Sequence, residues 1–162
     1  MNLTTLDLDG PTVTLRRAIL SDVSGIVALL AADQLRAAAE STAGDDRAGY
    51  ERAFLAIDAD PAHLLVVGTD ADGDIVATMQ LTFLPGLARA GATRLQIEAV
   101  RVDAALRGNG VGGAMIGWAI DEGRRRGATL VQLTSDLSRR SAHRFYERLG
   151  FVHSHAGFKR AL

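Results

Sequence analysis

A glycine-rich turn between an expected strand and an expected helix constrains this chain more than any other feature. Its sequence is Arg107-Gly108-Asn109-Gly110-Val111-Gly112. The turn follows a strand-like run over Leu95 to Val102 and opens a helix-like run over Val111 to Arg126. Glycines let a backbone approach a ligand closely, and the N–H groups and dipole of a helix N-terminus favour anions. We therefore expect this turn to bind a phosphate group.

The spacing of the glycines excludes two common kinds of phosphate loop. The chain has no Gly-x-x-x-x-Gly-Lys-Ser/Thr, so it lacks a Walker P-loop. A dinucleotide-binding fold places Gly-x-Gly-x-x-Gly after its first strand. The turn in this chain comes late in the sequence and has the pattern Arg-x-x-Gly-x-Gly.

That pattern, preceded by Val100-Arg101-Val102-Asp103, resembles the coenzyme A pyrophosphate loop of the GCN5-related N-acetyltransferase (GNAT) family. A second segment, Ala142 to Phe151, resembles the C-terminal signature of the same family, a short helix carrying Phe-Tyr followed by Leu-Gly-Phe. The two segments stand in the family's order and at a typical separation. The resemblance extends from about Val13 to the C-terminus.

Length and composition favour one globular domain. The chain has 162 residues, of which 48% are hydrophobic, so we expect a single domain over 1–162, with 1–11 as a flexible N-terminal segment. A net charge of −1 argues against a nucleic-acid partner, and no apolar run is long enough to span a membrane. The N-terminus lacks signal-peptide features, so the expected location is the cytoplasm. The absence of cysteine excludes an acyl-cysteine intermediate.

The order of elements predicts an α/β (α+β) fold. The expected strands cover residues 12–17, 63–69, 75–83, 95–102, 129–134, 151–155 and 158–162. The expected helices follow Ser21, cover about 47–57 and 111–126, and follow Ser138, with a loop over 34–49. Hairpins come first and strand–helix–strand units later, which gives a mixed, mostly antiparallel central sheet with helices on both faces. The GNAT resemblance adds a splayed pair of parallel strands that admits the pantetheine arm of the coenzyme.

The resemblance implies acetyl-CoA as co-substrate and assigns its contacts. The backbone from Gly108 to Gly113 would wrap the pyrophosphate, and Arg107 would add positive charge. Val100 and Val102 would bind pantetheine through their main chain while also serving as buried strand residues. The expected coenzyme-binding residues are thus Val100, Val102, Arg107, Gly108, Asn109, Gly110, Val111, Gly112 and Gly113, together with Ser138 and Arg139.

One position departs from the family pattern. Many members carry Asn three residues before the alanine of the second signature, where this chain has Arg139. Ser138 or Arg139 would then replace the Asn contact with the coenzyme. Arg139 and Arg140 would also suit the 3′-phosphate, although a solvated helix face explains them equally well.

The resemblance also assigns the proton transfers. Glu98 lies just before the pantetheine-binding stretch, where family members often have an acidic residue. An alkylamine with a pKa near 10 is protonated at neutral pH, so Glu98 would relay its proton through water or only orient the cation. Tyr146 stands where the family protonates the departing thiolate; alternatively it fills the apolar stripe beside Phe145. The oxyanion would meet the N–H of Val100.

The histidines do not predict a metal site. His153 and His155 are two residues apart, but no other ligand lies near them in sequence, so we expect no metal. The expected partner is a small-molecule amine, and the residues expected around it are Glu40, Asp45, Asp46, Gln80, Thr82, Glu98, Gln132, Asp136 and His155.

Three alternatives stay open at this stage. A non-catalytic acyl-CoA sensor would keep the glycine loop without a working base and acid. An acetyltransferase acting on a protein amine would share all of these motifs. A flavodoxin-like module would need a phosphate loop after the first strand, and none occurs near Arg17. A homodimer is the assembly considered, with the oligomeric state left open.

Overall fold

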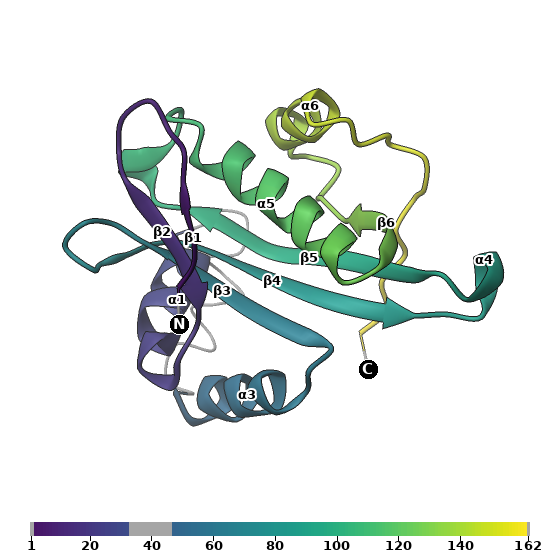
Figure 1. Cartoon of the computed structure of the whole chain (residues 1–162), viewed down its shortest axis with the longest axis horizontal. Helices are drawn as coiled ribbons and strands as arrows, with labels where there is room; N and C mark the ends of the chain where they lie inside the picture. The colour runs from purple at the N-terminus through teal and green to yellow at the C-terminus, as the bar shows by residue number, and fades with distance from the viewer. Residues whose placement is uncertain (1, 33–46, 162) are drawn as a thin grey trace.

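The computed structural model describes residues 2–32 and 47–161, which form one six-stranded sheet with helices on both faces (Figure 1). The strands lie in chain order: β1 (Asn2–Leu6), β2 (Val13–Arg17), β3 (His63–Thr69), β4 (Ile75–Pro85), β5 (Thr93–Val102) and β6 (Ala128–Leu133). All neighbouring pairs are antiparallel except β5 with β6. The helical segments are η1 (Leu20–Asp22), α1 (Val23–Ala31), α3 (Arg47–Ala59), α4 (Ala88–Gly91), η2 (Ala104–Leu106), α5 (Val111–Arg125) and α6 (Arg140–Arg148). The predicted fold class is confirmed.

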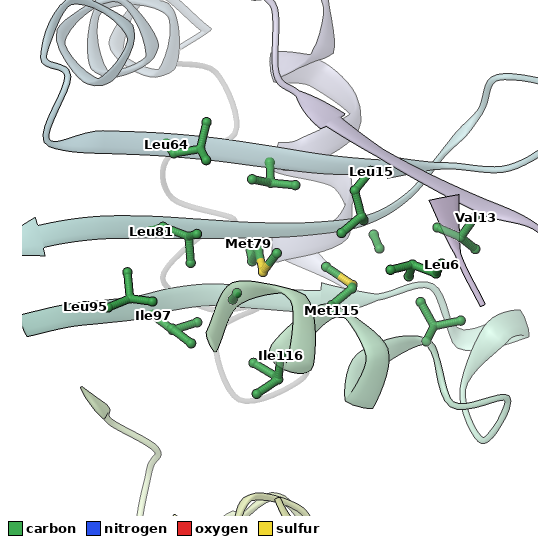
Figure 2. Packing of buried hydrophobic residues seen from close by; sticks show 14 of the residues in the cluster. Leu6, Val13, Leu15, Leu64, Met79, Leu81, Leu95, Ile97, Met115 and Ile116 are labelled. Atoms are coloured by element: carbon green, nitrogen blue, oxygen red, sulfur yellow. The ribbon is translucent and has the colours of Figure 1, made fainter. Parts of the chain in front are cut away.

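Two hydrophobic clusters sandwich the sheet. On β3, Leu64 and Val66 face one cluster and Leu65 and Val67 face the other, as the period of two in a strand requires. Helix α5 covers the first face, and α1 and α3 cover the second (Figure 1). Figure 2 shows Met115 of α5 among side chains from the strands.

A buried glutamate at the C-terminal end of α5 pairs with two arginines. Glu122, whose side chain is 7% exposed, accepts hydrogen bonds from Arg125 Nε and Nη2 at 2.8 and 2.7 Å and from Arg126 Nε at 2.6 Å. Burial alone would raise the pKa of Glu122, but the bonds from Arg125 and Arg126 outweigh it and hold the pKa below its ordinary value. Arg126 also lies over the ring of Phe83, 4.7 Å from its centroid. This network ties α5 to β4.

The N-terminal part of the chain departs from expectation. The first strand was predicted at 12–17, but β1 precedes it, within the segment expected to be flexible, and pairs with β2. Asp22 rather than Ser21 directly precedes α1, and it is held by a bidentate ion pair with Arg16 at 2.6 and 2.9 Å. The loop predicted over 34–49 lies mostly outside the described residues, as do Glu40, Asp45 and Asp46.

The two predicted C-terminal strands are wrong for the described residues. No strand follows α6 up to residue 161. A strand needs a ladder partner and a buried face, and this segment has neither: Val152 is 81% exposed and Phe158 is 96% exposed. Its apolar residues therefore gave a misleading signal. None of the described helices is both long enough and apolar enough to cross a bilayer.

Candidate functional site

Strands β5 and β6 separate part-way along their length. They pair in parallel from Thr93 with Ala128 to Ile97 with Leu133, where β6 ends, while β5 continues to Val102. The edge of β5 beyond Ile97 is thereby released from its partner. The splayed parallel pair implied by the GNAT resemblance is present.

A β-bulge lies at the point of separation. Glu98 pairs with Gln80 and Arg101 pairs with Thr78, so two residues of β5 oppose the single residue between them on β4. Ala99, one of the two, has a φ of 53°, in the left-handed region that alanine rarely adopts. The bulge bends β5 away from regular pairing next to the gap.

Alternate main-chain carbonyls of β5 point into this gap. The N–H of Asp103 donates to the Val76 carbonyl of β4 at 2.8 Å, so the polar groups of Val100 and Val102 point to the opposite edge. Both carbonyls accept a hydrogen bond from an arginine. Arg101 Nη1 donates to Val100 at 2.7 Å, and Arg107 Nε donates to Val102 at 3.2 Å. The edge thus offers main-chain groups to an extended ligand.

The glycine loop continues directly from this edge. After η2, Gly108 and Gly110 have φ values of 87° and 80°, which a glycine adopts without strain. Gly110 precedes α5, and the first α5 hydrogen bond runs from the Ala114 N–H to the Gly110 carbonyl at 3.0 Å. The N–H groups of Val111 to Gly113 therefore have no partner within the helix, and unpaired N–H groups at a helix N-terminus are suited to an anion.

Helix α6 brings the second motif against the first. A Cβ atom placed on Gly112 would lie 3.5 Å from Phe145 Cζ and 3.8 Å from Val102 Cγ2, which are ordinary van der Waals distances, so Gly112 lies beside both side chains. Phe145 and Phe151 contact the Tyr146 ring edge-on, with centroids 5.1 and 5.8 Å away. Motifs more than thirty residues apart in sequence therefore meet beside the gap.

Burial raises the pKa of the Tyr146 hydroxyl, while the positive charges of Arg139 and Arg101 act against that rise. The phenol is therefore protonated at neutral pH and lies within the field of two guanidinium groups. Arg101 belongs to the segment that precedes the glycine loop, and the sequence pattern assigned it no role. A lone arginine between two strand valines was the available signal.

Ser138 lies differently from expectation, and a second serine nearby was not predicted. Ser138 does not begin α6, because Arg139 precedes that helix. Instead Ser138 bonds Asp136 Oδ1 through its hydroxyl at 2.6 Å and its N–H at 2.9 Å, which lowers the pKa of Asp136. Just past β6, Ser135 Oγ is buried and has no hydrogen-bond partner among the described residues. It is a polar atom near the gap that sequence reasoning missed.

The sheet face under α1 and α3 carries a polar row across four strands. His63 pairs with Thr82, Thr82 with Gln96, and Gln96 with Gln132. Hydrogen bonds link His63 Nδ1 to Thr82 Oγ1 at 3.0 Å and Gln132 Nε2 to Gln96 Oε1 at 2.8 Å. Glu98 is exposed on the same face, beside Gln80. A sheet face that packs only against helices would be apolar, so this polar row favours contact with a ligand.

The histidines do not assemble a metal site. The ring centroids of His143 and His153 are 5.7 Å apart, and His155 Nδ1 lies 2.7 Å from Ser154 Oγ. Within residues 2–32 and 47–161, no group of three or more His, Asp or Glu side chains is close enough to hold an ion.

Residues 29–151, well over half of the chain, match the acetyltransferase (GNAT) family. The chain belongs to this family. The match includes the glycine loop and the Phe145-Tyr146 helix, so the resemblance drawn from those motifs is confirmed.

Three known proteins illustrate the relationship. The aminoalkylphosphonate N-acetyltransferase of Salmonella typhimurium is 40% identical over 67 residues, 41% of this chain and 44% of that protein. The chain therefore matches less than half of that relative's length. A solved structure described as a transcriptional regulator from Bacillus halodurans C-125 has a TM-score of 0.87 at 40% identity, covering 93% of this chain and 99% of that one. A putative acetyltransferase from Agrobacterium tumefaciens has a TM-score of 0.77 at 28% identity, covering 91% and 99%.

Proposed function

We propose that this chain transfers the acetyl group of acetyl-CoA to a primary amine of a small molecule, directly within a ternary complex. The observation that carries the proposal is the released edge of β5. Its main-chain groups face the gap at Val100 and Val102, and the chain then runs straight into the glycine loop at the start of α5. One continuous path therefore offers hydrogen bonds to pantetheine and then N–H groups to a pyrophosphate.

Binding of the coenzyme would exchange hydrogen bonds that already exist. The amide N–H groups of pantetheine would replace Arg101 at the Val100 carbonyl and Arg107 at the Val102 carbonyl. Arg107 is exposed, and once displaced it would be available to the pyrophosphate beside Gly108. An exchange of this kind leaves no carbonyl unsatisfied, so it avoids the free-energy cost of a lost bond.

The acceptor amine would bind over the polar row, with Glu98 next to the bulge. The Salmonella typhimurium relative is named for a small amine substrate, which supports the same class of acceptor here. Glu98 would receive, through water, the proton that an ammonium must lose before it attacks.

The transfer itself forms one bond and breaks another. The amine nitrogen attacks the thioester carbonyl carbon and forms a C–N bond, and the N–H of Val100 stabilises the resulting oxyanion. The C–S bond then breaks, the sulfur receives a proton from the Tyr146 hydroxyl, and the second proton lost by the acylated nitrogen restores the phenol. The chain has no cysteine, which excludes an acyl-cysteine intermediate and favours direct transfer.

An acetyl-CoA consumption assay across a panel of primary amines tests this function, with mass spectrometry of the products. We expect acetylated amine and free CoA in equal amounts. Coenzyme binding by calorimetry without turnover on any small amine would favour the sensor alternative. Turnover on peptide amines alone would favour a protein acceptor.

A further inference from the structure

The bulge in β5 places a carboxylate and a guanidinium on one face of the sheet. Residues 98 and 101 are three apart, and in a regular strand they would point to opposite faces. Their cross-strand partners, Gln80 and Thr78, are two apart on β4 and therefore share a face. The extra residue of the bulge thus brings Glu98 and Arg101 onto the same side.

Burial of the neighbouring residues agrees with this assignment. Ile97 is 1% exposed and belongs to the cluster under α5, which puts Glu98 on the opposite face. Val100 and Val102 pack against that same cluster, which puts Arg101 between them on the opposite face too. Both charged residues therefore belong to the face that carries the polar row.

The Arg101 guanidinium lies at the gap before the coenzyme binds, and displacement from the Val100 carbonyl would release it for an acceptor. Its Nη1 donates to the gap-facing carbonyl of Val100 at 2.7 Å. Its charge also reaches the Tyr146 hydroxyl on α6. Their partners are two residues apart on β4, so the backbone positions of Glu98 and Arg101 are about 7 Å apart along the sheet. This separation is comparable to the length of a short alkyl chain with a charge at each end.

We propose that Arg101 determines acceptor specificity by binding an anionic group, a carboxylate or a phosphonate, of a zwitterionic amine whose amino group lies at Glu98. This inference rests on the proposed acetyl transfer. The planar guanidinium fork suits both anions, because each offers two oxygens to parallel N–H donors. The bulge thus has a second role besides opening the sheet, since it sets the spacing between the two charges.

Matched acceptors test this proposal. β-Alanine, 2-aminoethylphosphonate and the neutral β-alaninamide are compared by kcat/KM in the wild-type enzyme, in Arg101→Gln and in Arg101→Lys. The readout is the ratio of each anionic amine to the amide. We expect Arg101→Gln to lower this ratio about 10- to 100-fold, the value of a charge-assisted hydrogen bond, whatever happens to the overall rate. Arg101→Lys keeps the charge without the fork and should give an intermediate ratio.

Arg94→Gln is the control, since it removes the same charge from the same strand seven residues before Arg101. Its ratio should equal that of the wild type. A wild-type enzyme that acetylates the amide as efficiently as both acids, or an unchanged ratio in Arg101→Gln, overturns this inference and leaves the proposed function intact. No acetylation of any amine overturns the two together. The two acids, compared with each other, identify which anion is preferred.

Discussion

Replacing Tyr146 by phenylalanine separates the proton-donating role of this side chain from its packing. The edge-on contacts of the ring with Phe145 and Phe151 involve the ring alone, and phenylalanine keeps them. Among the described residues no hydrogen bond to the hydroxyl is found. The change should therefore alter the free energy of unfolding by less than about 1 kcal/mol, the value of one hydrogen bond.

The expected rate loss follows from the acidities involved. If the thiol of the coenzyme is assigned the cysteine value of about 8.5 and the phenol about 10, proton transfer from a tyrosine to the thiolate is uphill by roughly 1.5 pKa units. Burial raises the pKa of Tyr146 further, and the charges of Arg139 and Arg101 offset part of that rise. General acid catalysis contributes about 10²–10⁴-fold, and an uphill transfer belongs near the lower limit. We expect the acetyl-transfer rate of Tyr146→Phe to fall about 10²-fold.

Single-turnover kinetics with saturating acetyl-CoA is the appropriate assay, because slow product release would otherwise hide a change in the chemical step. Tyr50→Phe is the matched control: it removes the only other tyrosine hydroxyl, from the opposite face of the sheet. A single-turnover rate for Tyr146→Phe within twofold of the Tyr50→Phe rate would refute the proton-donor role. A parallel fall in thermal stability and activity would instead support a structural role for the Tyr146 hydroxyl.

Three further predictions test the loop, the mechanism and the core. Gly110→Asp should abolish acetyl-CoA binding in calorimetry, because it places a carboxylate where the pyrophosphate is expected. The control is Gly127→Asp, at a φ of 78° beyond the other end of α5, which should bind acetyl-CoA normally. Normal binding by both variants would show that the loop is not part of the site. Mass spectrometry after incubation with acetyl-CoA alone should find no acetylated enzyme competent to pass its acetyl group to an amine. Glu122→Ala should destabilise the fold by about 2 kcal/mol in denaturant titrations, a value that already allows for the solvent exposure of the arginine partners. Asp121→Ala removes an exposed ion pair and should destabilise the fold by less than about 0.5 kcal/mol. Because the folded pKa of Glu122 is lowered, its contribution is complete above its ordinary pKa of 4.5 and is lost as the pH falls through the folded value.

Local sequence was sufficient for the glycine loop and the helix after it. Positive φ values at Gly108 and Gly110 and the apolar period of α5 depend on neighbouring residues only. The predicted helix over 111–126 therefore agrees with the observed Val111–Arg125 to within one residue. The family resemblance rested on this loop and on the Phe145-Tyr146 motif, both of which are local.

Tertiary structure alone decided which residues share the face around the gap. The bulge has alanine at its left-handed position, so no glycine marked it in the sequence. One extra residue in a strand reverses the side of every residue after it, which is why Arg101 and Glu98 could not be placed together from sequence. The polar row joins His63 to Gln132 across four strands by register, which depends on long-range pairing. The residues after Phe151 have a strand-like composition but lack a partner, and pairing, which is not encoded in any one segment, determines whether a strand forms.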